Sequence, residues 1–211
     1  MAGIPIIFKS ATLNLEGVLH LPESGGTGDV PAVVLCHPHP LYGGNMDNNV
    51  IMAVSRALLA EGIAAFRFNF RGVGASDGRF DNGVGEKDDI RAALAALGGR
   101  GEIDAAHLGL MGYSFGGMVA LDEGRANTHV RAIGCVAPVL IPGVLQDMDK
   151  PLIIISGTDD HVVAPADIYR EAATMGRPAT VTVVPGVDHF WWGHESAMAG
   201  KLAEFFREAL K

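Results

Sequence analysis

Cysteine, clustered positive charge and long hydrophobic runs are all scarce in this sequence. Its two cysteines, Cys36 and Cys135, each lie in a short apolar stretch typical of a strand, so we expect buried free thiols rather than a disulfide-stabilised fold. No apolar run approaches the roughly 18–20 residues that a membrane-spanning helix needs. We therefore expect no membrane partner.

The charge balance is acidic, with a net charge of −8 and no run rich in lysine or arginine. Binding to nucleic acid needs clustered positive charge that neutralises phosphates, so we expect no nucleic-acid partner. The first residues, Met1–Lys9, lack the basic segment and long apolar stretch of a signal peptide. Together with the free thiols, this predicts a cytoplasmic location.

The composition is that of a folded globular chain, because 48% of the 211 residues are hydrophobic and only 19% are charged. A chain of this length can bury a sizeable core and fits one domain. We find no internal repeat and no linker, and we interpret the glycine-rich stretch Gly25–Gly28 as a hairpin tip. We therefore treat residues 1–211 as a single domain.

Short apolar runs rich in valine, isoleucine and leucine alternate with patterns typical of helices. The later runs are continuously apolar, as in strands of a parallel sheet that are buried on both faces. The first two runs alternate better and are joined by a tight link, which favours an antiparallel start. The pattern predicts an α/β fold: a mostly parallel eight-stranded sheet with helices on both faces.

The boundaries of these elements follow from the same periodicity and from proline and glycine at helix ends. The expected strands are Ile4–Ser10, Leu13–Leu21, Ala32–His37, Ala64–Phe70, Leu108–Gly112, Ala132–Ala137, Leu152–Ser156 and Ala179–Val184. The expected helices are Asn48–Glu61, Glu86–Leu97, Phe115–Ala126, Pro165–Met175 and His194–Leu210.

Residues 112–117 read Gly-Tyr-Ser-Phe-Gly-Gly and contain the pattern Gly-x-Ser-x-Gly. A strand-like run precedes the pattern and a helical run follows it, which is the setting of a sharp strand-to-helix turn that exposes a serine hydroxyl. A side chain at Gly112 or Gly116 would crowd the neighbouring strand and helix. We interpret Ser114 as a catalytic nucleophile rather than as part of a turn that merely starts a helix.

The same pattern occurs a second time, at residues 74–78. This match lies several residues past its strand, in a run dense in glycine, aspartate and asparagine, and no apolar helix follows it at once. Such a composition is typical of a loop. We therefore interpret Ser76 as a loop serine and not as a nucleophile.

A serine hydroxyl is a poor nucleophile near neutral pH and needs a base, together with a group that orients the base. Among the eight histidines, His189 follows the last expected strand, at the sheet edge where Ser114 also lies. Asp159 and Asp160 follow the seventh expected strand, and Asp188 precedes the histidine directly. A neighbour in sequence rarely faces the imidazole correctly, so we interpret Asp188 as loop structure.

Five segments in this order make the sequence similar to the α/β-hydrolases over essentially its whole length. It resembles in particular a small bacterial subgroup with a His-Pro-His-Pro loop, related to dienelactone-hydrolase-like and serine-aminopeptidase-like proteins. The five segments are His37–Gly44, Phe68–Ser76, Gly112–Gly117, Gly157–Asp160 and Asp188–Phe190.

The resemblance implies an α/β-hydrolase fold in which Ser114 is the nucleophile and His189 the general base and acid. In this family the orienting acid usually stands third after the glycine that ends its strand, and counting from Gly157 gives Asp160. Asp159 is then a carboxylate of a turn or helix cap. The resemblance implies no cofactor.

Acyl transfer also needs two backbone N–H groups that stabilise the oxyanion. One belongs to the residue after the nucleophile, Phe115. The other belongs to the loop after the third expected strand, where two prolines have no N–H and His39, Leu41 or Tyr42 remain. The resemblance aligns His39 with the donor of its relatives.

His37 and His39 are also spaced like a pair of metal ligands. No third ligand with the spacing of a metal site follows them. We therefore expect no metal, and we interpret the prolines of this segment as residues that shape a rigid loop.

Many α/β-hydrolases carry a helical cap between their sixth and seventh strands. Here the corresponding segment, Val139–Pro151, is too short for a cap domain, so we expect a shallow and open site. Its walls are expected to include Leu41, Tyr42 and Trp191 as substrate-binding residues. Packing beneath the final helix is an equally good interpretation of Trp191, since aromatic side chains serve both purposes.

These features predict a serine hydrolase that cleaves an ester, thioester or amide of a small molecule through an acyl-enzyme, with a carboxylesterase as the first expectation. One alternative is a catalytically weak scaffold that binds a ligand, against which the complete Ser-His-Asp set argues. Another is a cofactor-free haloperoxidase or C–C bond hydrolase with the same three residues. For partners, we expect a small-molecule substrate and at most a second copy of the chain in a homodimer.

Overall fold

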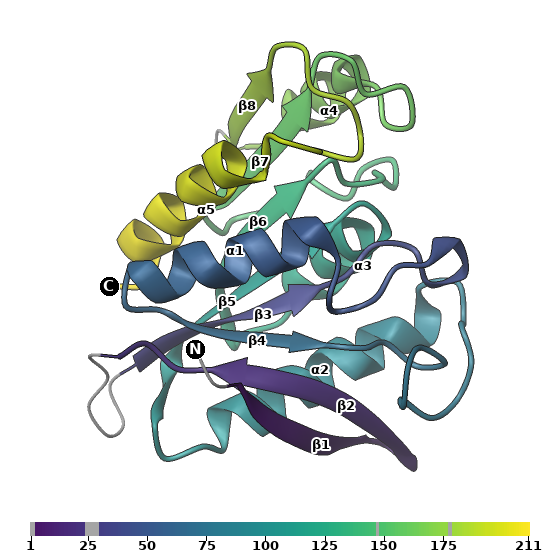
Figure 1. The fold of residues 1–211 in the computed structure, drawn as a ribbon. Helices are drawn as coiled ribbons and strands as arrows, with labels where there is room; N and C mark the ends of the chain where they lie inside the picture. The colour runs from purple at the N-terminus through teal and green to yellow at the C-terminus, as the bar shows by residue number, and fades with distance from the viewer. Residues whose placement is uncertain (1–2, 24–29, 147, 177–178) are drawn as a thin grey trace.

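The computed structural model describes residues 3–23, 30–146, 148–176 and 179–211, so the expected hairpin tip at Gly25–Gly28 lies outside the described residues (Figure 1). The strands are β1 (Ile4–Ser10), β2 (Leu13–His20), β3 (Val30–Cys36), β4 (Ala64–Phe68), β5 (Ile103–Tyr113), β6 (Val130–Val136), β7 (Leu152–Gly157) and β8 (Thr180–Val184). The helices are the 3-10 helix η1 (Pro40–Tyr42) and the α-helices α1 (Asn49–Ala60), α2 (Val84–Gly98), α3 (Phe115–Gly124), α4 (Pro165–Ala172) and α5 (Glu195–Ala209).

All eight strands belong to one sheet, in the order β1-β2-β4-β3-β5-β6-β7-β8 (Figure 1). The pairs β1–β2 and β2–β4 are antiparallel, and the remaining pairs are parallel. The predicted eight-stranded α/β sheet with an antiparallel start is confirmed. Because parallel strands end at the same edge of a sheet, the loops after β3, β5, β7 and β8 meet there.

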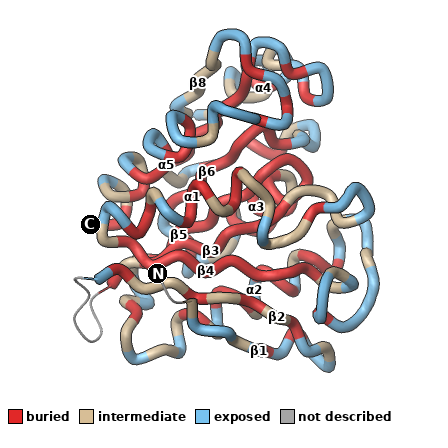
Figure 2. Tube along the Cα trace, viewed as in Figure 1, coloured by how far each residue is buried: buried red, intermediate tan, exposed pale blue. Residues whose placement is uncertain are grey.

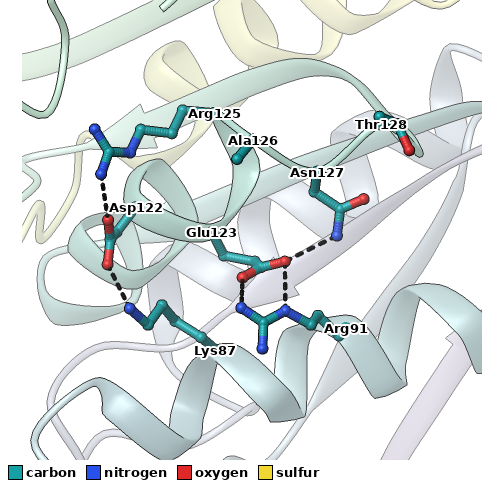
Figure 3. Close-up of a pocket in the computed structure, with 8 residues that line it drawn as sticks. All are labelled: Lys87, Arg91, Asp122, Glu123, Arg125, Ala126, Asn127 and Thr128. Atoms are coloured by element: carbon teal, nitrogen blue, oxygen red, sulfur yellow. Dashed lines mark hydrogen bonds and ion pairs between the residues drawn. The ribbon is translucent and has the colours of Figure 1, made fainter. Parts of the chain in front are cut away.

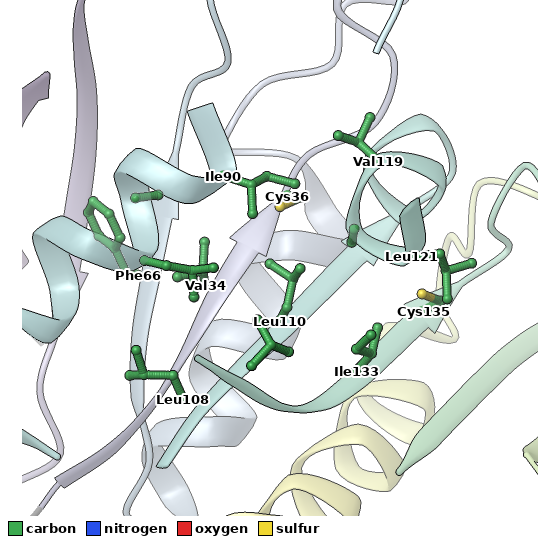
Figure 4. Packing of buried hydrophobic residues seen from close by; sticks show 14 of the residues in the cluster. Val34, Cys36, Phe66, Ile90, Leu108, Leu110, Val119, Leu121, Ile133 and Cys135 are labelled. Carbon is green, nitrogen blue, oxygen red and sulfur yellow. The ribbon is translucent and has the colours of Figure 1, made fainter. Parts of the chain in front are cut away.

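Helices cover both faces of the sheet and enclose a hydrophobic core on each. Val54 of α1 and Leu202 of α5 belong to one core. Ile90 of α2 and Val119 of α3 belong to the other (Figure 4), and so does Ile168 of α4. The central strands are buried along most of their length (Figure 2). Their successive side chains enter alternate cores, which explains why their sequences are continuously apolar.

One strand is longer than its apolar run. The sequence predicts a start at Leu108, whereas β5 begins at Ile103, which pairs with Val30 of β3. The residues between them are partly exposed and include Asp104, so this part of the strand carries no continuous hydrophobic signal. Strand pairing uses backbone N–H and C=O groups, which every residue except proline provides in full.

The helices lie close to their predicted positions, and the largest difference is at the end of α4. The predicted helix runs to Met175, whereas α4 ends at Ala172. The start of α2 also differs, since the helix begins at Val84 after Gly83, a residue with a positive φ of 87° whose N–H is bonded to the carboxylate of Glu86. None of the helices in the described ranges is long and apolar enough to cross a membrane.

A buried carboxylate, Asp89 of α2, connects three parts of the chain. Its Oδ1 accepts hydrogen bonds from the Ser10 hydroxyl and from Arg71 Nη2, each at 2.7 Å. Its Oδ2 accepts from the backbone N–H and the Nε of Arg71, at 3.1 and 3.0 Å. A fully buried charge is tolerated where such partners replace the water it has lost. The cluster therefore holds α2 against the end of β1 and the loop after β4.

We expect Asp89→Asn to lower the free energy of unfolding by about 2–4 kcal/mol, because the guanidinium of Arg71 loses its charged partner in a buried position. The matched control is Asp88→Asn, one residue earlier in α2, whose side chain is mostly exposed and pairs with Arg91 at the surface. The control should change the free energy by no more than about 0.5 kcal/mol. Urea unfolding checks both values, and equal losses in the two variants would contradict this account.

Candidate active site

Ser114 occupies a strained turn between β5 and α3. Its backbone has φ 54° and ψ −116°, a conformation that residues with side chains rarely adopt. A Cβ atom on Gly112 would lie 2.2 Å from the carbonyl oxygen of Gly116, and one on Gly116 would lie 2.3 Å from that of Cys36. Only glycine fits at both positions, which confirms the steric reason for the motif.

The second serine of the same pattern, Ser76, has a structural role. Its hydroxyl donates a 2.7 Å hydrogen bond to the carbonyl of Asn69 and accepts a 3.1 Å bond from the N–H of Glu16. The side chain of Asn69 is in turn bonded to the N–H of Met46 and to the carboxylate of Glu16. Ser76 is thus part of a hydrogen-bonded loop, as the sequence predicted.

The structure brings Ser114, His189 and Asp160 together from three separate loops. The hydroxyl oxygen of Ser114 lies 3.0 Å from His189 Nε2, and His189 Nδ1 lies 2.8 Å from Asp160 Oδ2. A carboxylate only accepts hydrogen bonds, so Nδ1 carries the ring proton and Nε2 of the neutral ring is free to accept from the serine. The three side chains therefore form a continuous hydrogen-bonded chain from hydroxyl to carboxylate.

The side chain of Asp160 is held in place by hydrogen bonds other than the one to the histidine. Its other oxygen, Oδ1, accepts hydrogen bonds from the N–H groups of Val162 and Val163 at 2.9 and 2.8 Å. Burial alone would raise the pKa of Asp160, but the hydrogen bonds from His189 and from these amides outweigh burial and lower the pKa. Asp160 is therefore a carboxylate at neutral pH, with both oxygens fixed.

The two neighbouring aspartates do not face the histidine. Asp159 is exposed and accepts a 2.7 Å hydrogen bond from the hydroxyl of Thr158. Asp188 accepts from the N–H groups of Phe190 and Trp191 in its own turn. The structure thus separates three candidate carboxylates into one partner of His189 and two turn residues, as the sequence predicted.

Sequence reasoning missed Tyr113, the residue before the serine. Its buried hydroxyl donates a 2.7 Å hydrogen bond to the carbonyl oxygen of His189. Burial is the main cause that raises the pKa of Tyr113, so the phenol remains a donor. This bond ties the end of β5 to the loop that carries the histidine. The only sequence signal was a large polar side chain at the variable position of the Gly-x-Ser-x-Gly motif.

The loop after β3 turns sharply through η1. His39 caps this short helix, because its Nδ1 accepts a 3.2 Å hydrogen bond from the N–H of Leu41. The N–H of Tyr42 donates to the carbonyl of His39 at 3.1 Å. The backbone N–H groups of His39 and Phe115, by contrast, donate to no other residue in the part of the chain that the structure describes.

His37 serves this loop as a structural residue. Its Nε2 accepts a 3.1 Å bond from the N–H of Phe70, which leaves Nδ1 to donate to the carbonyl of Pro38 at 2.7 Å. Burial lowers the pKa of His37 to about 4, against a smaller opposing effect of the Pro38 bond, so the ring is neutral. Among the described residues, no group of histidine, cysteine, aspartate and glutamate side chains is arranged to hold a metal.

Residues 13–150 match the model of the X-Pro dipeptidyl-peptidase (S15) family. The chain belongs to this family of α/β-hydrolases. An uncharacterized protein of Rickettsia prowazekii is 30% identical to it over 77% of this chain and 73% of its own length. A solved structure from Xanthomonas campestris, described as an α/β serine hydrolase without a lid, has 30% identity and a TM-score of 0.88, covering 100% of this chain and 96% of that one.

A more distant relative of this S15-family hydrolase has a named substrate. The bis(hydroxyethyl) terephthalate hydrolase of Streptomyces coelicolor is 24% identical over 78% of this chain, which spans 50% of that protein's length. The described residues between β6 and β7 form turns and irregular loop without a helix, and the structure from Xanthomonas campestris is likewise described as lacking a lid. The prediction of an α/β-hydrolase fold without a cap is confirmed.

Ser114 and His189 line a groove of about 670 Å³ at the carboxyl edge of the hydrolase sheet. Tyr42 lines the groove, as predicted, but the exposed side chain of Leu41 does not. The lining residues are Pro38, His39, Tyr42, Gly43, Gly44, Asn48, Phe80, Asn82, Tyr113, Ser114, Phe115, Met118, Val139, Val162, His189 and Phe190.

The prediction that Trp191 is a substrate-binding residue in the wall of the groove is wrong. Its side chain is 0% exposed and belongs to the core that α1 and α5 cover, so it does not line the groove. Its backbone has a positive φ of 65°, in the turn where Asp188 accepts its N–H. This turn directs the indole inward, and the alternative of packing beneath the final helix is the one that holds.

A second hollow, of about 820 Å³, lies away from Ser114 between α2 and the end of α3 (Figure 3). Its charged side chains pair with one another. Glu123 accepts two hydrogen bonds from Arg91, at 2.9 and 2.6 Å, and Asp122 accepts one from Lys87 at 2.8 Å. The hollow is therefore lined by a surface network of ion pairs whose charged side chains already have partners.

We expect the stability of the protein to rise with pH between about 4 and 6.5 in part because of His37. The unfolded state binds a proton below the ordinary histidine pKa of about 6.5, whereas the folded state binds it only below about 4. This shift in the pKa of His37 changes the free energy of unfolding by about 3 kcal/mol between the two ends of the range. The contribution is complete at pH 7 and is lost as the pH falls towards 4. Urea unfolding at several pH values measures it.

The matched variant is His37→Gln, whose amide can accept from Phe70 and donate to Pro38 without titrating. Carboxylates contribute alike to both proteins, so the variant's stability should change with pH less steeply than that of the wild type. Parallel curves for the two proteins would contradict the role assigned to His37.

Proposed function

We propose that this protein is a carboxylesterase that hydrolyses small-molecule esters through an acyl-enzyme on Ser114. The observation that carries the proposal is the hydrogen-bonded chain from Ser114 through His189 to Asp160, with distances of 3.0 and 2.8 Å. Those distances lie within the range that proton transfer in a Ser-His-Asp triad requires. Membership of a hydrolase family supports the same reaction class.

The first half of the reaction acylates the serine. As the Ser114 oxygen bonds to the ester carbonyl carbon, its proton moves to His189 Nε2, and the carbonyl oxygen becomes an oxyanion. The tetrahedral intermediate then collapses, the bond to the alcohol oxygen breaks, and His189 returns the proton to the departing alcohol. Asp160 keeps the ring in the correct tautomer and stabilises its positive charge during these steps.

The second half repeats the same proton transfers with water. His189 takes a proton from a water molecule whose oxygen attacks the acyl carbon, and it then protonates Ser114 as the acid is released. Because the same imidazole acts in both halves of the reaction, its orientation must stay the same when the nucleophile changes from Ser114 to water. The fixed carboxylate of Asp160 and the hydroxyl of Tyr113, which holds the carbonyl of His189, support that requirement.

Two backbone N–H groups are the proposed oxyanion donors, those of Phe115 and His39. Neither donates to another residue in the described ranges, whereas the N–H groups of Leu41 and Tyr42 are both committed to His39. An oxyanion hole needs donors that are fixed in position and otherwise unpaired. The strained turn at Ser114 and the capped helix η1 hold the two candidates in that state.

The composition of the groove favours an ester over an X-Pro peptide. A dipeptidyl-peptidase must bind the positively charged amino terminus of its substrate, which calls for a carboxylate in the groove. Among the described lining residues there is no aspartate or glutamate. The relative from Streptomyces coelicolor is named for its action on a terephthalate ester, which supports the same choice.

We expect Ser114→Ala to lower kcat for p-nitrophenyl acetate by at least about 10⁴-fold, because the nucleophile is removed. The matched control is Ser76→Ala, the serine of the second Gly-x-Ser-x-Gly match, which should keep its activity within about threefold. A fluorophosphonate probe should label the wild type and the control variant but not Ser114→Ala. Loss of activity in Ser76→Ala with retention in Ser114→Ala would overturn the assignment.

We expect Asp160→Asn to reduce kcat by about 10⁴-fold. The asparagine oxygen can still accept from Val162 and Val163, but its amide group then donates towards His189 and stabilises the wrong ring tautomer. Asp159→Asn, one residue earlier in an exposed turn, should reduce kcat less than about threefold. Steady-state kinetics check both variants, and equal losses would argue against the assigned acid.

A further inference from the structure

We infer that the groove selects neutral esters whose acyl group carries an aromatic ring. The inference rests on the proposed ester hydrolysis and adds the class of substrate. It is based on four rings that line the groove beside Ser114, which we call the aromatic wall: His39, Tyr42, Phe80 and Phe115. They come from the loops after β3 and β4 and from the first residue of α3.

His39 lies at the centre of the aromatic wall. Its ring centroid is 4.7 Å from that of Tyr42, 4.8 Å from that of Phe80 and 5.0 Å from that of Phe115. Phe80 and Phe115 contact each other directly, with centroids 5.4 Å apart. These separations are those of favourable aromatic pairs, so a substrate ring placed in the groove can extend the same arrangement.

The position of His189 indicates which part of the ester meets the aromatic wall. His189 must protonate the departing alcohol, so the alcohol lies on its side of the groove, where the ring of Phe190 is 5.8 Å away. The proposed oxyanion donors are instead backbone groups of His39 and Phe115, two members of the wall. The acyl group is directed away from the departing alcohol, and we place it along the remaining side of the groove, which the aromatic wall lines.

The aromatic wall carries no net charge. Burial lowers the pKa of His39, against a smaller effect of Glu86, and its Nδ1 is already occupied by the N–H of Leu41. Glu86 itself is fully buried, and its two oxygens accept from the N–H groups of Asp81 and Gly83. No lysine, arginine, aspartate or glutamate belongs to the described lining of the groove. A charged acyl group would therefore lose its hydration without gaining a partner.

Two rings of the aromatic wall, those of His39 and Phe115, are held in place before a substrate binds. The ring of His39 is fixed by the cap of η1, and Phe115 begins α3 directly after the strained turn at Ser114. A groove of about 670 Å³ has room for an aryl acyl group together with its alcohol. Because these side chains need little reordering, more of the ring-to-ring attraction is retained as affinity.

The test compares two p-nitrophenyl esters that differ only in the acyl ring, phenylacetate and cyclohexylacetate. A methylene group separates each ring from the carbonyl, so neither ring is conjugated with it. Dividing kcat/KM for each ester by its rate constant for hydrolysis by hydroxide removes the remaining difference in intrinsic reactivity. We expect the corrected kcat/KM of wild-type protein to be roughly three- to tenfold higher for phenylacetate. A 4-carboxyphenylacetate ester should be at least about tenfold poorer than phenylacetate.

Two phenylalanine variants locate the effect. Phe80→Leu keeps an apolar side chain but removes a ring of the aromatic wall, so the ratio of phenylacetate to cyclohexylacetate should fall towards one. Phe190→Leu removes a ring on the alcohol side and should keep the wild-type ratio. Thermal unfolding of both variants checks that they are folded, and the ratio is read within each protein, so differences in expression or overall rate do not enter it.

The outcomes separate this inference from the proposed function. If neither these p-nitrophenyl esters nor p-nitrophenyl acetate is hydrolysed, the proposed carboxylesterase is wrong, and the inferred substrate class is overturned with it. If the esters are hydrolysed but the corrected ratio of phenylacetate to cyclohexylacetate is one or less, the aromatic acyl preference alone is overturned. A ratio that falls in Phe190→Leu and persists in Phe80→Leu would also overturn it, since the acyl group would then lie on the other side.

Discussion

The strained backbone at Ser114 is the constraint on which the site depends. A positive φ at a residue with a side chain costs about 1–3 kcal/mol and persists only where the surrounding structure enforces it. Here the N–H of Ser114 is bonded to the carbonyl of Val136 on β6, and Gly116 lies directly against the carbonyl of Cys36 on β3. The turn therefore depends on the parallel pairing of β5 with its two neighbours, β3 and β6, in a fixed register.

The other functional loops are each fixed by buried hydrogen bonds of their own. Two backbone amides hold Asp160, the Tyr113 hydroxyl holds the backbone of His189, and His37 connects the loop after β3 to Phe70 in the loop after β4. None of these bonds needs a substrate or a moving lid. The site is therefore preorganised while remaining open, which is the arrangement that electrostatic stabilisation of a transition state requires.

The features that place this protein in its family differ from those that determine which substrate it accepts. The S15 family model matches most of the chain, and the lidless neighbour from Xanthomonas campestris covers all of it, so the fold and the general reaction class are shared. The lining of the groove is what distinguishes substrates, because charge and ring contacts act only at short range. A neutral groove with an aromatic wall at His39 and Phe80 is the basis on which we propose ester hydrolysis rather than the X-Pro peptidase activity of the family's name.

Local sequence determined most of the fold and the central residues of the site. Continuous apolar runs identified the central strands because both of their faces are buried, whereas alternation identified β1 and β2. A tight glycine pattern identified Ser114 because the turn excludes side chains. Asp160 followed from the resemblance to the α/β-hydrolases, whose orienting acid usually stands third after the glycine that ends its strand. The resemblance also aligned His39, which lines the groove as part of a short capped loop.

Only the tertiary structure decided the burial of Trp191, the absence of Leu41 from the groove lining, the hydrogen bond from Tyr113 and the extension of β5 to Ile103. Each depends on which distant segment lies opposite, and a periodic pattern carries no information about that. An aromatic residue after a strand has the same local signal whether it faces a core or a groove. Long-range packing, rather than residue type, makes that choice.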